Sequence, residues 1–180
     1  MLEKQQPPLR PALWLVFALV GAASLGLDLW TKQWAWDTLR PPGGAPVMLW
    51  EPTIELAFAY NRGSAFGLVP RLDYPIALLL VTAAMIGWIV FTARSPGAGR
   101  LRFAGAGMIV GGALGNLFDR LFRDDGLGHR GVVDFIKVNF PWGGSWPNFN
   151  IADAAIVIGV VVLLWTLREP PAERSAPASR

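Results

Sequence analysis

The side chains best suited to chemistry in this sequence stand at the ends of long apolar stretches. They are Asp28 and Lys32 after one stretch; Asn116, Asp119 and Arg120 at the end of another; and Asn150 and Asp153 at the start of the last. Ionisable groups are costly near a membrane interior, and by default they mark a functional site. Carboxylates placed close together share a proton, so this set favours acid–base chemistry or proton relay.

The composition indicates a membrane protein. Of the 180 residues, 53% are hydrophobic and 16% are charged, whereas a soluble domain carries about 25% charged residues. Nine Trp fit this class, because indoles favour the headgroup region. The chain has no Cys, which excludes disulfides and thiolate metal sites. The net charge of +3, without a basic stripe, favours contact with anionic lipid and not with nucleic acid.

Four apolar stretches have about the length that a membrane-spanning helix needs. They cover residues 11–29, 74–93, 103–121 and 150–168. We therefore expect a single integral membrane domain over residues 1–180, built as an all-α four-helix transmembrane bundle. A cleaved signal peptide is the alternative for the first stretch, but three further stretches follow it and Asp28 to Lys32 fits a site.

The connections predict the topology. The segment between the second and third stretches is short and carries Arg94, Arg100 and Arg102, so we place it and both termini in the cytoplasm. The long segments 31–73 and 121–148 then lie outside, and residues 169–180 form a disordered tail. Strand-like composition in 47–50 and 54–60, with alternating side chains in the second segment, predicts a small extracytoplasmic β-sheet. We expect a short interfacial helix over 132–138.

Four antiparallel helices bring the polar ends of the first, third and fourth stretches to one side of the membrane. Asn116, Asp119 and Arg120 are spaced i, i+3 and i+4, so they share a face of the third helix. Gly107, Gly111 and Gly115 precede them at four-residue steps. Small residues in such a row let neighbouring helices approach closely, so the third helix is expected to be central.

Five segments, taken in order, resemble the lipoprotein signal peptidases (signal peptidase II). They are Asp28-Leu-Trp-Thr-Lys32, Asn61-Arg-Gly-Ser-Ala-Phe66, Gly111 to Arg120, Val132-Val-Asp-Phe-Ile136, and Phe149-Asn-Ile-Ala-Asp153 continuing to Ile156. The resemblance covers roughly residues 12 to 168. It is the order of the five on a chain with four apolar stretches that makes it specific.

This resemblance implies a function. Asp134 and Asp153 would be the catalytic aspartates of a membrane endopeptidase. The substrate would be a diacylglyceryl-modified prolipoprotein, cut on the N-terminal side of the lipidated Cys, and globomycin would inhibit. Supporting or substrate-binding positions would be Asp28, Lys32, Asn61, Gly63, Asn116, Asp119, Arg120 and Asn150. We expect a monomer in the bacterial inner membrane, with its site near the outer face and no metal or organic cofactor.

Two aspartates suit peptide hydrolysis. One ionised carboxylate takes a proton from water, and a protonated partner polarises the scissile carbonyl. Asp134 stands among Val and Phe side chains, and burial there would raise its pKa. Asp153 lies in the first turn of a helix, where the dipole favours a charged carboxylate.

Structural roles compete with these assignments. Asn150 and Asp153 have the spacing of a helix capping box, and Asp28 and Lys32 that of an i,i+4 ion pair. Asp119 and Arg120 could anchor a helix at the headgroups, Asn61 and Gly63 could form a turn, and Asp134 could be a charge on an interfacial helix.

Other functions fit less well. His129 is the sole His, which disfavours a Ser-His-Asp triad and a zinc protease. A Ser–Lys dyad would need Ser64 or Ser145 with Lys32 or Lys137. The alternative of another class is a small proton-coupled transporter or membrane assembly protein; a transporter would show a polar path to the other face, and none is evident. The loop from Trp142 to Trp146 fits either an interfacial anchor or a substrate contact.

Overall fold

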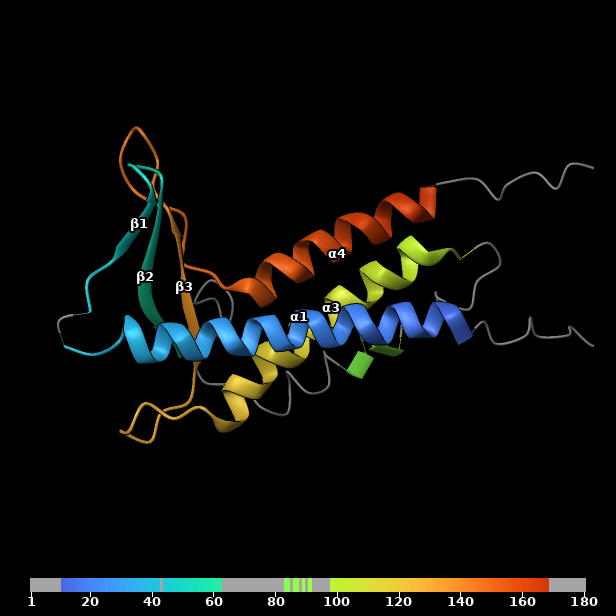
Figure 1. Ribbon diagram of the computed structural model, residues 1–180, viewed down its shortest axis with the longest axis horizontal. Helices are drawn as coiled ribbons and strands as arrows, with labels where there is room; N and C mark the ends of the chain where they lie inside the picture. Colours follow the sequence, from blue (N-terminus) through green and yellow to red (C-terminus); the bar gives the residue numbers. More distant parts are fainter. Residues whose placement is uncertain are drawn as a thin grey trace, which may run out of the picture.

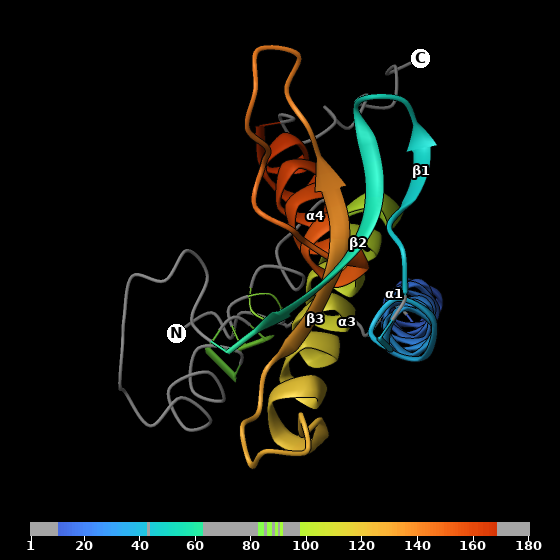
Figure 2. The same ribbon diagram turned by 90° about the vertical axis from the view of Figure 1, so that its left-hand side faces the viewer.

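The chain folds into long helices with a small sheet across one end of them. The computed structural model describes residues 11–42, 44–62, 83–84, 86–87, 89, 91 and 98–168. The elements there are α1 (Pro11–Thr38), β1 (Val47–Trp50), β2 (Ile54–Asn61), α3 (Arg100–Phe122), β3 (Val132–Val138) and α4 (Ile151–Arg168). Figure 1 shows α1, α3 and α4 packed together with the sheet at one end, and Figure 2 views the sheet from that end.

The expected helix of residues 74–93 lies largely outside the described residues. The six residues described within it are all helical, and Ile89 packs in a buried cluster with Ala106 and Ile109 of α3 and Leu163 of α4. Three complete helices and part of a further helical segment are therefore observed among the described residues, and the four-helix bundle stays a prediction.

Helix α1 is longer than the sequence predicts. We expected it to end near residue 29, but it continues through Asp28 and Lys32 to Thr38. Both side chains are fully buried and paired, so they have no need to reach water at a helix end. The helix ends shortly before Pro41, which disfavours helical geometry in the residue before it. Its 28 residues span about 42 Å, which exceeds the roughly 30 Å hydrocarbon core.

Glycines allow α3 to pack closely against both neighbours, as the spacing predicts. A Cβ at Gly107 would lie 2.6 Å from the carbonyl oxygen of Phe17 in α1. On the other face of α3, a Cβ at Gly112 would lie 2.5 Å from the carbonyl oxygen of Ala152 in α4. The two interfaces place α3 between α1 and α4, so the prediction of a central third helix is confirmed.

The sheet has three antiparallel strands in the order β1-β2-β3. The expected extended segments β1 and β2 are confirmed. The expected interfacial helix over 132–138 is wrong, because this segment is β3 and pairs with β2 from Asn61↔Val132 to Ile54↔Val138. Four of its seven residues are Val or Ile, and β-branched side chains favour a strand over a helix.

Two of the described helices, α1 and α3, are long and apolar enough to cross a membrane, and α4 has a shorter apolar stretch over Ile151–Thr166. Large apolar side chains project outward from the helices, among them Leu15 and Leu19 of α1 and Val161 and Trp165 of α4. Hydrocarbon is the solvent that suits such surfaces. The C-terminal ends of α1 and α3 and the N-terminal end of α4 meet at the sheet (Figure 1), which confirms that the polar ends gather on one side.

Candidate active site

Asp134 lies in β3 and is almost completely buried, with 4% of its surface exposed. Its Oδ1 accepts a hydrogen bond of 2.8 Å from Nδ2 of Asn150, and its Oδ2 accepts one of 3.1 Å from Nδ2 of Asn61. Asn61 is the last residue of β2 and pairs with Val132, so its side chain lies diagonally across the ladder from Asp134. The strand pairing therefore positions one amide donor on this carboxylate.

Asp153 lies in the first turn of α4 and forms, with Asn150, the capping box that the spacing predicts. Its backbone N–H donates to Oδ1 of Asn150 at 3.0 Å, and its Oδ2 accepts from the backbone N–H of Asn150 at 3.2 Å. The cap leaves the amide group of Asn150 directed at Asp134. The structural and site assignments of Asn150 are therefore compatible, because one side chain caps the helix and joins the two carboxylates.

Asn116 of α3 is the second link. Its Oδ1 accepts hydrogen bonds from Nζ of Lys32 at 2.8 Å and from Nδ2 of Asn150 at 3.1 Å. A lysine ammonium can only donate, so the amide oxygen of Asn116 must face Lys32. The NH2 group then faces Asp153, to which it donates at 2.8 Å.

Beneath this network lies a buried set of charges. Nζ of Lys32 lies 2.8 Å from Oδ2 of Asp28 and 3.5 Å from Oδ2 of Asp119, and all three side chains are fully buried. Asp28 also accepts from the backbone N–H of Ala152 at 2.9 Å, and Asp119 from that of Val133 at 3.1 Å. The two aspartates thus fix the start of α4 and the strand β3, which carry the other two carboxylates.

Arginines complete the cluster. Arg120 is partly buried and donates to the backbone oxygen of Asn116 at 3.2 Å. Its guanidinium is close enough to Asp134 and Asp153 for electrostatic attraction to both carboxylates. Arg123, which the sequence analysis missed, lies 2.8 Å from Oδ1 of Asp119 and over the ring of Trp36. Its i,i+4 spacing from Asp119 was the signal that could have found it.

The setting of Asp134 changes its acidity. Burial, together with the nearby charge of Asp153, raises its pKa to about 6, against the opposing effects of the hydrogen bonds from Asn61 and Asn150 and the charge of Lys32. The predicted rise is therefore found, with burial as its main cause. A carboxyl group with such a pKa can both hold and release a proton near neutrality.

Most of the expected site residues lie together, and Gly63 lies outside the described residues. His129 lies in the loop after α3 and faces Asp125, while Lys137 pairs with Glu55 in the sheet. Lys32 is held by two carboxylates, which disfavours its use in a Ser–Lys dyad. Among the described residues no three His, Asp or Glu side chains converge as a metal site requires.

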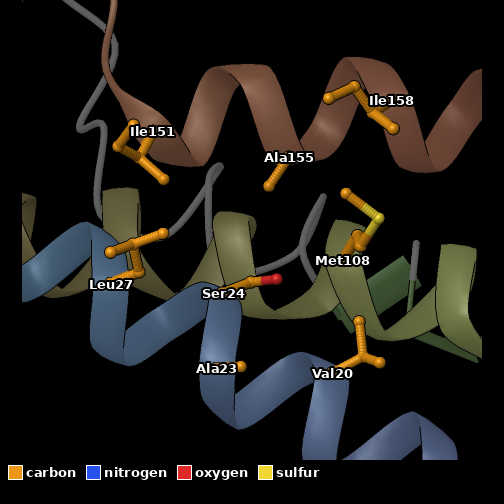
Figure 3. Close-up of a pocket in the computed structure, with 8 residues that line it drawn as sticks. All are labelled: Val20, Ala23, Ser24, Leu27, Met108, Ile151, Ala155 and Ile158. Carbon is orange, nitrogen blue, oxygen red and sulfur yellow. The ribbon is translucent and has the colours of Figure 1, made fainter.

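An apolar pocket of about 280 Å³ lies between the helices. Figure 3 shows its lining: Val20, Ala23, Ser24 and Leu27 from α1, Met108 from α3, and Ile151, Ala155 and Ile158 from α4. None of these described lining residues is titratable, so the chemistry belongs to the carboxylate cluster and not to this pocket.

The fold is that of solved membrane proteins. The structure matches two solved bacterial membrane enzymes: one with a TM-score of 0.67 at 21% identity, covering 99% of this chain and 100% of that one, and one with a TM-score of 0.66 at 23% identity, covering 93% and 99%.

The sequence gives the family. The profile of signal peptidase (SPase) II matches residues 20–168, so the chain belongs to the signal peptidase II family, a family of membrane proteases. A lipoprotein signal peptidase of Oleidesulfovibrio alaskensis is 37% identical over 155 residues, which is 84% of this chain and 92% of the relative. One from Geobacillus thermodenitrificans is 33% identical over 150 residues, 83% and 87% of the two chains. The resemblance inferred from the five segments is thereby confirmed.

Proposed function

We propose that this chain is an aspartic endopeptidase that removes the signal peptide from diacylglyceryl-modified prolipoproteins, on the N-terminal side of the lipidated Cys. One observation carries the proposal. Asp134 and Asp153 come from different elements, yet Asn150 and Asn116 connect them in a single hydrogen-bonded network at the end of the helices. A pair of carboxylates held in this way is what water-dependent hydrolysis of a peptide bond requires.

In the proposed reaction Asp153 is ionised and Asp134 carries the shared proton. Asp153 takes a proton from water while the water oxygen attacks the scissile carbonyl carbon, and Asp134 gives its proton to the carbonyl oxygen. Collapse of the tetrahedral intermediate returns that proton to Asp134 and breaks the C–N bond. Asp153 then gives its proton to the leaving amine, so both carboxyl groups regain their starting states.

The location of the pair suits a lipid-linked substrate. It lies at the end of the bundle, where the helices meet the sheet (Figure 1). We propose that the prolipoprotein enters sideways from the bilayer and keeps its acyl chains in lipid while its peptide bond reaches the carboxylates. The protein would act as a monomer in the bacterial inner membrane, with both termini cytoplasmic, the site near the outer face, and globomycin as an inhibitor, as the family resemblance implies.

The test is a gel-shift assay of the purified protein with a diacylglyceryl prolipoprotein. We expect Asp134→Asn and Asp153→Asn each to lower turnover by about 100-fold or more, because each removes a proton-transferring group and keeps the shape. Asp37→Asn is the matched control, since Asp37 is exposed near the end of α1 and its carboxylate accepts a hydrogen bond of 3.0 Å from Nε2 of Gln33. Thermal unfolding of each variant checks that it is folded.

The outcomes separate the proposal from its rival. If the wild type leaves the precursor uncut, the peptidase proposal fails, and proton uptake into vesicles becomes the next assay, as for a proton-coupled transporter. If either Asn variant keeps most of its turnover, that aspartate has a structural role and the catalytic pair is wrongly assigned.

A further inference from the structure

The two neighbours of Asn61 are both bound to the loop that follows α3. The hydroxyl group of Tyr60 lies 2.9 Å from the backbone oxygen of Arg123 and 3.3 Å from that of His129. Nη2 of Arg62 lies 2.5 Å from Oδ2 of Asp125. The amide that donates to Asp134 therefore sits between two anchors on loop 123–130.

This loop is made firm by its own hydrogen bonds. Oδ1 of Asp125 accepts from the backbone N–H groups of Leu127 at 2.8 Å and His129 at 3.1 Å. Oδ1 of Asp124 accepts from the backbone N–H of Gly126 at 2.7 Å. Gly126 has a φ of 86°, which glycine adopts without steric cost, so the residue type suits the turn.

Asp125 is the centre of the loop. Its side chain is only 10% exposed, whereas that of Arg62 is 52% exposed. Burial alone would raise the pKa of Asp125, but the two backbone N–H groups and the charges of Arg62 and His129 hold it below its ordinary value. Arg40, which follows α1, donates to the backbone oxygen of Asp125 at 2.8 Å. The carboxylate of Asp125 that binds Arg62 is therefore charged, and Asp125 is held in place by loop N–H groups, by His129 and by Arg40.

We propose that Asp125 and Arg62 are positioning residues that hold the amide of Asn61 on the carboxylate of Asp134. The inference rests on the proposed function, since it assigns a role within that site. Asn61 is the last residue of β2 and pairs with Val132. The next residue, Arg62, links this end of the strand to Asp125. Helix α3 thus acts on both carboxylates. Its Asn116 orients Asp153, and the loop at its C-terminal end orients Asp134 by way of Asn61.

The test combines kinetics with a titration that does not depend on cleavage. Full-length protein with ¹³C-labelled Asp carboxyl groups is titrated by NMR, and kcat and KM are measured with diacylglyceryl prolipoprotein. The variants are Arg62→Gln, Arg62→Lys, Asp125→Asn and Asn61→Ala. Arg130→Gln is the control, because Arg130 is an exposed arginine of the same loop.

We expect Arg62→Gln and Asp125→Asn to raise the pKa of Asp134, because a weaker hydrogen bond from Asn61 favours its charged form less. We expect kcat to fall roughly two- to five-fold, as for the loss of a partly exposed ion pair, with KM unchanged. Arg62→Lys should restore most of the loss. In the Asn61→Ala background, Arg62→Gln should have no further effect.

An unchanged pKa of Asp134 in both Arg62→Gln and Asp125→Asn would overturn the proposal. So would a further fall in kcat when Arg62→Gln is added to Asn61→Ala. Asp125→Asn keeps an acceptor for the loop N–H groups, so it provides a second reading if Arg62→Gln unfolds. If the wild type does not cleave, the proposed function fails, and the titration still decides whether Arg62 positions Asn61.

Discussion

At Asp134, burial and hydrogen bonding act on the same carboxyl group in opposite directions. Removal from water and the charge of Asp153 favour the protonated form, while the amides of Asn61 and Asn150 favour the charged form. The first pair of effects is the larger, so the pKa rises from 3.8 to about 6. The group can therefore transfer a proton near neutral pH. Keeping it ionised while it is buried lowers the free energy of unfolding.

This cost predicts a pH dependence of stability. Because the folded pKa of about 6 exceeds the unfolded value near 3.8, the folded state holds the proton more strongly, and stability is lost as pH rises through that window. Relative to Asp134→Asn, the wild type should lose on the order of 2–3 kcal/mol between pH 4 and pH 7. Thermal unfolding of both proteins in detergent across this range measures the difference. If the melting temperatures of the two proteins differ by the same amount at every pH in this range, the pKa of Asp134 is not raised.

At the scale of elements, the site depends on how closely α1 and α4 approach α3. Gly111 and Gly115 face α1, where Gly115 leaves room for the carboxylate of Asp28. Any side chain at these positions would push α1 outward and draw Lys32 away from Asn116. The glycine row therefore sets both the packing of the helices and the orientation of the amide that binds Asp153.

The prediction at this scale compares two glycines. In Gly111→Ala the added Cβ would collide with the carbonyl oxygen of Gly21 and lie 2.9 Å from Cβ of Ser24, so we expect a loss of about 1–3 kcal/mol and of turnover. Gly26→Ala is the control, since a Cβ there meets nothing within 4 Å. Melting temperatures and turnover of both variants test this. Equal effects of the two substitutions would show that close helix approach is not the reason for the glycines.

At the scale of the whole molecule, the sheet and its loops project to one side at the end of the helices (Figure 2). Trp50 at the end of β1 is 70% exposed and Trp142 in the loop before α4 is 81% exposed. Trp142 stacks on Phe140, so the loop presents a flat aromatic surface. Aromatic side chains at this level of a membrane protein favour the interface between lipid and water, and an anchoring role for this loop stays a prediction.

The orientation in the membrane can be tested because the chain contains no Cys. Trp142→Cys should react with a membrane-impermeant maleimide added outside intact spheroplasts, since we place the sheet on the outer face. Ser175→Cys, in the C-terminal tail, should react only after the membrane is permeabilised. The opposite pattern of labelling would reverse the proposed topology, and labelling of both sites from outside would exclude it.

The sequence by itself determined where the polar groups stand along the chain. Two apolar stretches carry polar groups at their C-terminal ends, Asp28 and Asn116, and the last stretch carries Asp153 at its start. Antiparallel helices bring those ends together whatever their detailed packing. Strand-like composition predicted β1 and β2, with alternation as a further signal for β2, and the spacing of Asn150 and Asp153 predicted the capping box. These features depend on residues close in sequence, or on the number of helices, so one sequence was enough to find them.

Only the tertiary structure decided the rest. Val132–Val138 is a strand because β2 offers it a partner, and α1 continues past Lys32 because α3 supplies that ammonium with Asp119 and Asn116. The contact of Asp28 with the backbone of Ala152 joins residues 124 positions apart, and the anchoring of Arg62 to Asp125 joins residues 63 apart. Such pairings depend on strand register and on the distance between helices, and neither is set by the residues on one side of the contact alone.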